Sequence, residues 1–217
     1  MLATSFDIIC LQETWLLPND LSLLNTVIPS MSGSGISAVD LSDGILCGRP
    51  CGGVAFLCQK ALCYNVNYVN SGYDWCYAVT LSDGNSNTLT IINLYLPCDT
   101  YTNVDLYLDY LGKLEAFISD VDGPYLILGD FNNNPQDNSS PCGKDLRDFV
   151  SDSDFVMFDS CLPIDSYTYL SDAWHSTSWL VHCIGPKYLL DSLADCRIIY
   201  DSFNSDHLPL SVSINIL

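Results

Sequence analysis

The sequence has few basic residues. Its 217 residues include 7 Lys and Arg against 26 Asp and Glu, which gives a formal net charge of −19 at pH 7. The scattered cations are Arg49, Lys60, Lys113, Lys144, Arg147, Lys187 and Arg197. A protein that grips nucleic acid through its phosphates normally carries a basic stripe. We therefore do not expect tight, metal-free binding to DNA, whereas a surplus of carboxylates suits divalent cations.

Long apolar runs and zinc motifs are also absent from the sequence. The apolar runs are strand-sized, so we expect no membrane partner, and residues 1–15 lack the pattern of a secretory signal. The eleven cysteines contain no CxxC pair, and Cys47 and Cys51 have no second pair or histidine at zinc spacing. We expect an intracellular protein, nuclear or cytoplasmic, with reduced and buried cysteines.

The composition favours a folded chain, since 48% of the residues are hydrophobic and only 15% are charged. A stripe of apolar residues predicts a long helix at 104–121, and shorter helices are expected at 20–28 and 145–151. Residues 30–46 are rich in Ser and Gly and predict a loop, and Asp83-Gly84 predicts a hairpin turn. The expected strands are 6–11, 53–59, 77–81, 89–96, 125–132, 155–159, 178–184, 196–200 and 208–216. This alternation predicts a mixed α/β domain.

Four polar clusters stand at the ends of apolar runs: LQETW (11–15), NLYLP (93–97), GDFN (129–132) and SDHLPL (205–210). Each alone has a plain structural interpretation, such as a solvated strand end, a turn or a capping motif. Polar groups at strand ends can, however, converge on one rim of a sheet. Four such clusters in one chain therefore indicate a site.

These clusters contain the residue types that cleavage of a phosphate ester requires. Glu13 and Asp130 are hard oxygen donors of the kind that Mg²⁺ prefers. Asn132 can orient a water or a phosphate oxygen, and His207 can act as a general base or as a cation near neutral pH. Asp206 could hold a metal or a water molecule. Together they offer charge neutralisation and an activated water.

The ordered motifs resemble those of the endonuclease/exonuclease/phosphatase superfamily, and in particular the apurinic/apyrimidinic-like endonuclease domains of non-LTR retrotransposons. GRPCGGVAF (48–56), the Thr168-Tyr169 pair and SWLVH (178–182) join the four clusters, so the resemblance covers nearly the whole chain. It implies one domain over residues 1–217 with a four-layered α/β sandwich: two facing mixed β-sheets flanked by helices. It also implies cleavage of a DNA phosphodiester with Mg²⁺, or Mn²⁺ as the alternative ion, and a downstream reverse transcriptase domain in a longer reading frame.

The resemblance also implies a role for each matching residue. Asp130 would position or deprotonate the attacking water, and His207 would stabilise the charge of the transition state. The remaining roles are metal binding by Glu13, contact with the phosphate or leaving group by Tyr95, phosphate binding by Asn132, and support of the metal by Asp206.

Two departures from the family pattern put activity in doubt. The family opens with a strand that carries an Asn of the site, and this chain starts after it, so we expect an N-terminally truncated domain and an unpaired sheet edge. The family also has Asp where this chain has Val181, so His207 would lack its carboxylate partner. In a well-studied triad the loss of that partner lowers the rate about 10⁴-fold. The neighbouring His182 would point to the opposite face and is expected to be structural or solvated.

We therefore predict a Mg²⁺-dependent DNA-nicking hydrolase of retrotransposon type that is impaired by Val181. The first alternative is a catalytically inactive remnant or binding module of the same fold. The second is a phosphatase or another phosphodiesterase, because a shared fold indicates a reaction class and not a substrate.

Overall fold

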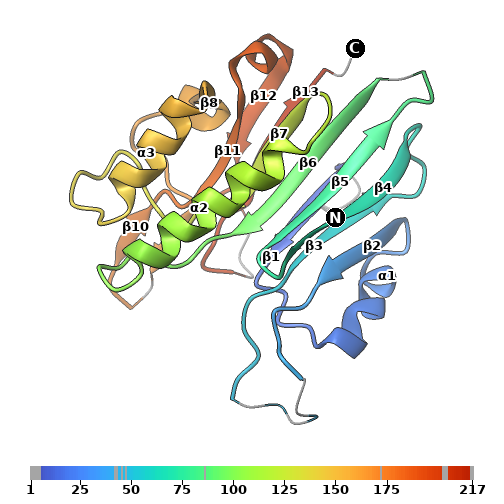
Figure 1. The fold of residues 1–217 in the computed structure, drawn as a ribbon, viewed down its shortest axis with the longest axis horizontal. Helices are drawn as coiled ribbons and strands as arrows, with labels where there is room; N and C mark the ends of the chain where they lie inside the picture. The colour runs from blue at the N-terminus through green and yellow to red at the C-terminus, as the bar shows by residue number, and fades with distance from the viewer. Residues whose placement is uncertain are drawn as a thin grey trace. The chain divides into compact units, whose positions relative to one another are not determined.

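The computed structural model describes residues 6–41, 44, 46, 48–85, 87–171, 173–201 and 205–215 (Figure 1). The chain divides into two compact units, Met1–Tyr95 and Leu96–Leu217. Each unit has its own antiparallel strands, and each is described by itself below.

The first unit contains a three-stranded sheet in the order β1-β3-β2, with both pairings antiparallel. Its elements are β1 (Ile8–Gln12), η2 (Pro18–Leu23), α1 (Leu24–Val27), β2 (Met31–Ile36) and β3 (Val54–Gln59). The central strand, β3, is buried along almost its whole length. Leu24 of α1 packs with Met31, Ala55 and Leu57, which closes a small core over one face of this sheet. The strands predicted at 6–11 and 53–59 are thereby confirmed, as β1 and β3.

The Ser- and Gly-rich segment 30–46 was expected to be a loop, and this prediction is wrong for Met31–Ile36, which form β2. The glycines serve close packing and not a turn. A Cβ atom at Gly33 would lie 2.6 Å from the Cβ of Leu24, and one at Gly35 would lie 2.7 Å from the Cβ of Ala55. Pairing with β3 therefore overrides the local preference of this composition for a loop.

A second antiparallel meander completes the first unit. It consists of β4 (Asn65–Tyr73), β5 (Cys76–Ser82) and β6 (Thr88–Tyr95). Ser82 pairs with Thr88 across the Asp83-Gly84 turn, so the predicted hairpin is confirmed. β4 was not predicted; it is a half-buried strand in which three asparagines interrupt the apolar residues.

The second unit is built on the strands β7, β11 and β8, in that order and all antiparallel. In Figure 1, α2 and α3 lie on the near side of these strands. Its strands are β7 (Tyr125–Asp130), β8 (Phe155–Met157), β9 (Tyr169–Ser171), β10 (Ser176–Ser178), β11 (Val181–Pro186), β12 (Leu193–Ile198) and β13 (Leu210–Ile214). Its helices are α2 (Val104–Ser119), α3 (Gly143–Asp152), η3 (Phe158–Cys161) and η4 (Lys187–Ser192). The short pairs β9–β10 and β12–β13 complete the unit.

The long helix follows its predicted apolar stripe. The buried residues of α2 are Tyr107, Leu111, Leu114 and Ile118. They recur every three or four positions and so share one face. The strand expected at 178–184 is instead divided between β10 and β11, because Trp179 and Leu180 leave the extended pairing.

The mixed α/β fold predicted from the sequence is confirmed. No helix among the described residues is both long and apolar enough to span a membrane. The expectation of buried cysteines holds only in part: of the ten described cysteines, four are buried and four are exposed.

Candidate functional site

The first unit brings together Glu13 and Tyr95. Glu13 follows β1 directly, and Tyr95 ends β6. The Tyr95 hydroxyl donates a hydrogen bond of 2.5 Å to Oε1 of Glu13. The Glu13 side chain is exposed, and its backbone has φ of 50°, in the left-handed region that residues other than glycine rarely adopt. Such conformations persist where the surroundings enforce them, and they cluster at functional sites.

A buried asparagine that was not among the predicted site residues holds the end of β1. Asn93 is 0% exposed. Its Nδ2 donates to the carbonyls of Leu11 and Ala55, at 3.0 and 2.9 Å, and its Oδ1 accepts from Nε2 of Gln12. It therefore fixes the residue before Glu13 from the side of β6. The signal was present in the NLYLP motif, where a polar residue interrupts an apolar strand.

The Gly52-Gly53 pair holds the backbone that follows Glu13. The amides of Thr14 and Trp15 donate to the carbonyls of Gly53 and Gly52, at 3.2 and 3.0 Å. Both glycines have positive φ, 64° and 85°. A Cβ at Gly53 would lie 2.8 Å from Oγ1 of Thr14. The backbone at Gly53 therefore approaches the segment after Glu13 closely.

We expect Gly53→Ala to lower the free energy of unfolding by about 1–3 kcal/mol, because it adds a steric clash to an unfavourable φ. Gly84→Ala is the matched control, since Gly84 has φ of 79° but nothing within 4 Å of its added Cβ. Urea unfolding of both variants separates the clash from the conformational strain. An equal loss in the two would show that close approach at Gly53 contributes nothing.

The second unit brings together Asp130 and Asn132 in a tight turn after β7. Asp130 is 4% exposed, and its Oδ1 accepts a hydrogen bond of 2.9 Å from the amide of Asn132. Asn132 has φ of 51°, and its Nδ2 donates to the carbonyl of Leu96 at 2.9 Å. Because an amide NH₂ has two hydrogens, one donor of Asn132 remains for a ligand.

Two groups outside the motif hold this turn. The amide of Phe131 donates to the carbonyl of Leu180 at 2.9 Å. The hydroxyl of Tyr107, which is 0% exposed, donates to the carbonyl of Phe131 at 3.1 Å. Burial raises the pKa of Tyr107 well above its ordinary value, and nearby acidic groups such as Cys142 add to this effect, so the hydroxyl keeps its proton and remains a donor.

His207 lies beside this turn. Its Nε2 is 3.8 Å from Oδ2 of Asp130. The residue forms an isolated β-bridge with Tyr169, whose ring centroid is 5.0 Å from that of the imidazole. The structure thus places three of the predicted residues, Asp130, Asn132 and His207, within one small region of the second unit.

Thr168 connects His207 with position 181. Its carbonyl accepts from the amide of Leu208 at 2.7 Å, and its Oγ1 accepts from the amides of Leu180 and Val181 at 2.8 and 2.9 Å. Val181 also stands in register with Asp130 across β11 and β7. Val181, which stands where the resemblance implied an aspartate, is therefore a direct neighbour of Asp130.

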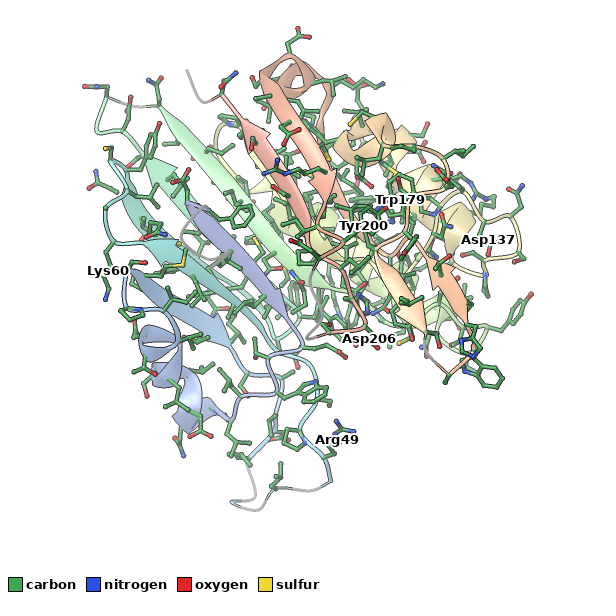
Figure 2. The ribbon with its side chains drawn as sticks, turned by 180° about the vertical axis from the view of Figure 1, so that it is seen from behind. Arg49, Lys60, Asp137, Trp179, Tyr200 and Asp206 are labelled. Carbon is green, nitrogen blue, oxygen red and sulfur yellow. The ribbon has the colours of Figure 1, made fainter. Side chains whose placement is uncertain are left out.

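Asp206 is exposed, and Figure 2 shows it on the segment that leads into β13. Its backbone carbonyl accepts from the amide of Leu170 at 2.9 Å. Within the described parts of the chain, no group of three or more His, Cys, Asp and Glu side chains is arranged to hold a metal ion. The predicted pair of metal ligands, Glu13 and Asp206, belongs to separate units and remains a prediction.

Comparison with known proteins identifies the fold. The family described as Endonuclease/Exonuclease/phosphatase matches residues 1–181. Among solved structures, an AP endonuclease from Leishmania major is similar with a TM-score of 0.78 and 15% identity, over 98% of this chain and 79% of that one. The 3′ phosphatase NExo from Neisseria, bound to a product DNA hairpin, gives a TM-score of 0.72 and 15% identity, over 96% and 89%. The endonuclease domain of TRAS1, a telomere-specific non-LTR retrotransposon, gives 0.70 and 14%, over 98% and 88%. No curated relative matches the sequence.

Proposed function

Because this chain belongs to the endonuclease/exonuclease/phosphatase family, we propose that it hydrolyses DNA phosphodiester bonds with the help of a divalent metal ion, and that Val181 reduces its rate. The observation that carries this proposal is the turn after β7. There a carboxylate that is 4% exposed, Asp130, lies 3.8 Å from the imidazole of His207. At this spacing the carboxylate can transfer a proton while the imidazole stabilises negative charge on the same substrate.

Each residue of the turn has a distinct task. Asp130 would accept the proton of the attacking water, while its Oδ1 is held by the amide of Asn132. Asn132 would donate its second amide hydrogen to a non-bridging phosphate oxygen. His207 would face the negative charge that develops on the phosphate in the transition state.

The donor chemistry in the first unit suits Mg²⁺, with Mn²⁺ as the alternative. Glu13 offers an exposed carboxylate, and the hydroxyl of Tyr95 orients one of its oxygens. Mg²⁺ binds through one or two carboxylates while it keeps several waters, so the carboxylate of Glu13 would suffice on the protein side. Such an ion would supply positive charge to the phosphate oxygens.

The neighbours support DNA as the substrate, whereas the charge of this chain argues against tight binding. Two of the solved relatives are named as endonucleases, and the third is a 3′ phosphatase bound to DNA. DNA is therefore the substrate that we propose, and phosphate monoesters at DNA ends are the alternative. With a net charge of −19, the domain would bind DNA weakly, unless a reverse transcriptase domain in a longer reading frame supplies basic residues.

A second candidate is an inactive binding module of the same fold, and Val181 is the observation that favours it. Nicking of supercoiled plasmid, with Mg²⁺ and with chelator, distinguishes the two. Chelator-sensitive nicking supports the hydrolase. If the protein fails to nick yet folds, the binding module is favoured.

We expect Glu13→Gln to raise the Mg²⁺ concentration needed for half-maximal nicking at least about tenfold, because the amide removes the charge of a metal ligand. Glu115→Gln is the control, since Glu115 is an exposed carboxylate on α2. The measurement is a Mg²⁺ titration of the initial nicking rate. Equal midpoints in the two variants would remove Glu13 from the metal site.

A further inference from the structure

A buried histidine–aspartate pair in the second unit has no part in the reaction described above. His182 of β11 is 2% exposed, and Asp159 of η3 is 1% exposed. Nδ1 of His182 lies 2.7 Å from Oδ2 of Asp159, and the amide of Cys183 donates to the other carboxylate oxygen at 3.0 Å. Of the two roles expected for His182, the structural one is therefore confirmed and the solvated one is wrong.

Aromatic rings enclose the imidazole of His182. The ring of Phe131 lies at a centroid distance of 5.7 Å, and that of Trp179 at 6.0 Å. Trp179, marked in Figure 2, is itself only 4% exposed. Water is thus kept from an ionisable pair, an arrangement that is destabilising unless every polar atom finds a partner.

The hydrogen bonds of His182 define where its protons are. Nε2 lies 2.9 Å from the carbonyl oxygen of Asn133. A carbonyl can only accept, so Nε2 must carry a hydrogen. Nδ1 faces a carboxylate, so the contact of 2.7 Å requires one further proton shared between Nδ1 and Asp159. The intact pair therefore holds one proton more than a neutral imidazole beside a carboxylate anion.

The carbonyl that His182 holds belongs to the residue immediately after the catalytic turn. Asn133 follows Asp130 and Asn132 without a break, and it is 0% exposed. Its side chain donates to Oγ of Ser140 at 2.9 Å. With the Asn132 backbone in the left-handed region, the turn needs anchors on both sides, and His182 supplies one of them.

We propose that the His182–Asp159 pair positions the Asp130–Asn133 turn for hydrolysis through the hydrogen bond from Nε2 to the carbonyl of Asn133, and that the turn is held only while the pair keeps its shared proton. This inference rests on the proposed function. His182 and Asp159 are positioning residues, because neither would touch the substrate.

Loss of the shared proton would break the hydrogen bond between His182 and the carbonyl of Asn133. Burial lowers the pKa of His182, but the carboxylate of Asp159, its hydrogen bond, the Asn133 carbonyl and the more distant Asp130 raise it, and the net pKa lies above its ordinary value. When the proton leaves, the Asp159 anion keeps the hydrogen on Nδ1, since that bond is charge-assisted. Nε2 is then bare and faces the lone pairs of the Asn133 carbonyl, so the anchor is lost.

The sign of the pH dependence follows from the raised pKa of His182. The contribution of the pair to stability is complete below the ordinary histidine pKa of about 6.5 and disappears as the pH rises through the higher folded-state pKa. The catalytic rate constant should fall over the same alkaline range, by about 10- to 100-fold, because small displacements of reacting groups have effects of this size.

Asp159→Asn separates positioning from simple structural support. The asparagine Oδ1 can still accept from the amide of Cys183, and its NH₂ can donate to Nδ1 of a neutral His182. Nε2 then keeps its hydrogen at every pH above the acidic range, and the bond to Asn133 persists. We expect wild-type kcat to show an alkaline step that Asp159→Asn lacks, with KM unchanged in both.

Nuclear magnetic resonance tests the pair without using activity. In uniformly ¹⁵N-labelled protein, the chemical shift of His182 Nε2 should report the loss of its hydrogen as the pH rises, and the amide signals of Asn132 and Asn133 should shift with it. Asp159→Asn should show neither change. An alkaline step in kcat that is identical in Asp159→Asn would overturn the proposal. If no form of the protein hydrolyses DNA, the proposed function fails, but the amide signals still test the positioning. Asn132 and Asn133 amide shifts that change over the same pH range as the His182 ring support it, and amide shifts that stay constant there refute it.

Discussion

Asp130→Asn is expected to reduce chelator-sensitive hydrolysis of DNA by about 10²–10⁴-fold, the range associated with a positioned general base. The asparagine retains an oxygen that can accept from the amide of Asn132, which Oδ1 of Asp130 now does at 2.9 Å. The shape of the turn should therefore survive while the negative charge and the basic oxygen are removed. The measurement is the initial rate of plasmid nicking at saturating Mg²⁺.

Asp137→Asn is a closely matched control for this change. Asp137 lies in the same unit (Figure 2), and its Oδ1 accepts from the amide of Ser139, two residues ahead, at 2.8 Å. The local hydrogen bond is thus the same as that of Asp130, but the side chain is exposed. We expect Asp137→Asn to leave the rate within about twofold of wild type, since surface substitutions away from special features have small effects. If Asp130→Asn behaves like this control, Asp130 is not the base.

Sequence patterns revealed the proposed reacting groups better than the residues that hold them. Asp130, Asn132 and His207 stood out because strand ends break an apolar run, and the structure places them together. Their anchors act across long stretches of sequence. Asn93 reaches the carbonyl of Leu11, and His182 reaches that of Asn133. Nothing periodic in the sequence marks such side-chain-to-backbone contacts.

In the fold, too, local features were predicted and features that depend on distant residues were not. The apolar stripe of α2 and the Asp83-Gly84 turn are local signals, and both structures formed as predicted. Segments whose structure depends on a partner strand were missed. β2 is extended because it pairs with β3, and β4 because it pairs with β5, although neither has a strong strand composition.

Val181→Asp is expected to raise the rate of DNA hydrolysis, by up to about 10⁴-fold if the missing carboxylate has the importance of its counterpart in a well-studied triad. Position 181 is paired in register with Asp130, whose Oδ2 lies 3.8 Å from Nε2 of His207. A carboxylate there would join the region where His207 must hold its orientation. The new charge would also lie across from Asp130, so a lower melting temperature should accompany the gain.

Val181→Asn is the variant that tells charge from shape, because it has nearly the size of aspartate without its anion. A gain in Val181→Asp that Val181→Asn lacks, measured as kcat in the same nicking assay, would mean that His207 needs a negative partner. Equal gains would instead point to hydrogen bonding alone. If the wild-type chain already cleaves at an ordinary enzymatic rate, of about 1–10³ s⁻¹, and Val181→Asp adds nothing, then the impairment that we propose is wrong. In that case the pairing of His207 with Asp130 is sufficient for catalysis.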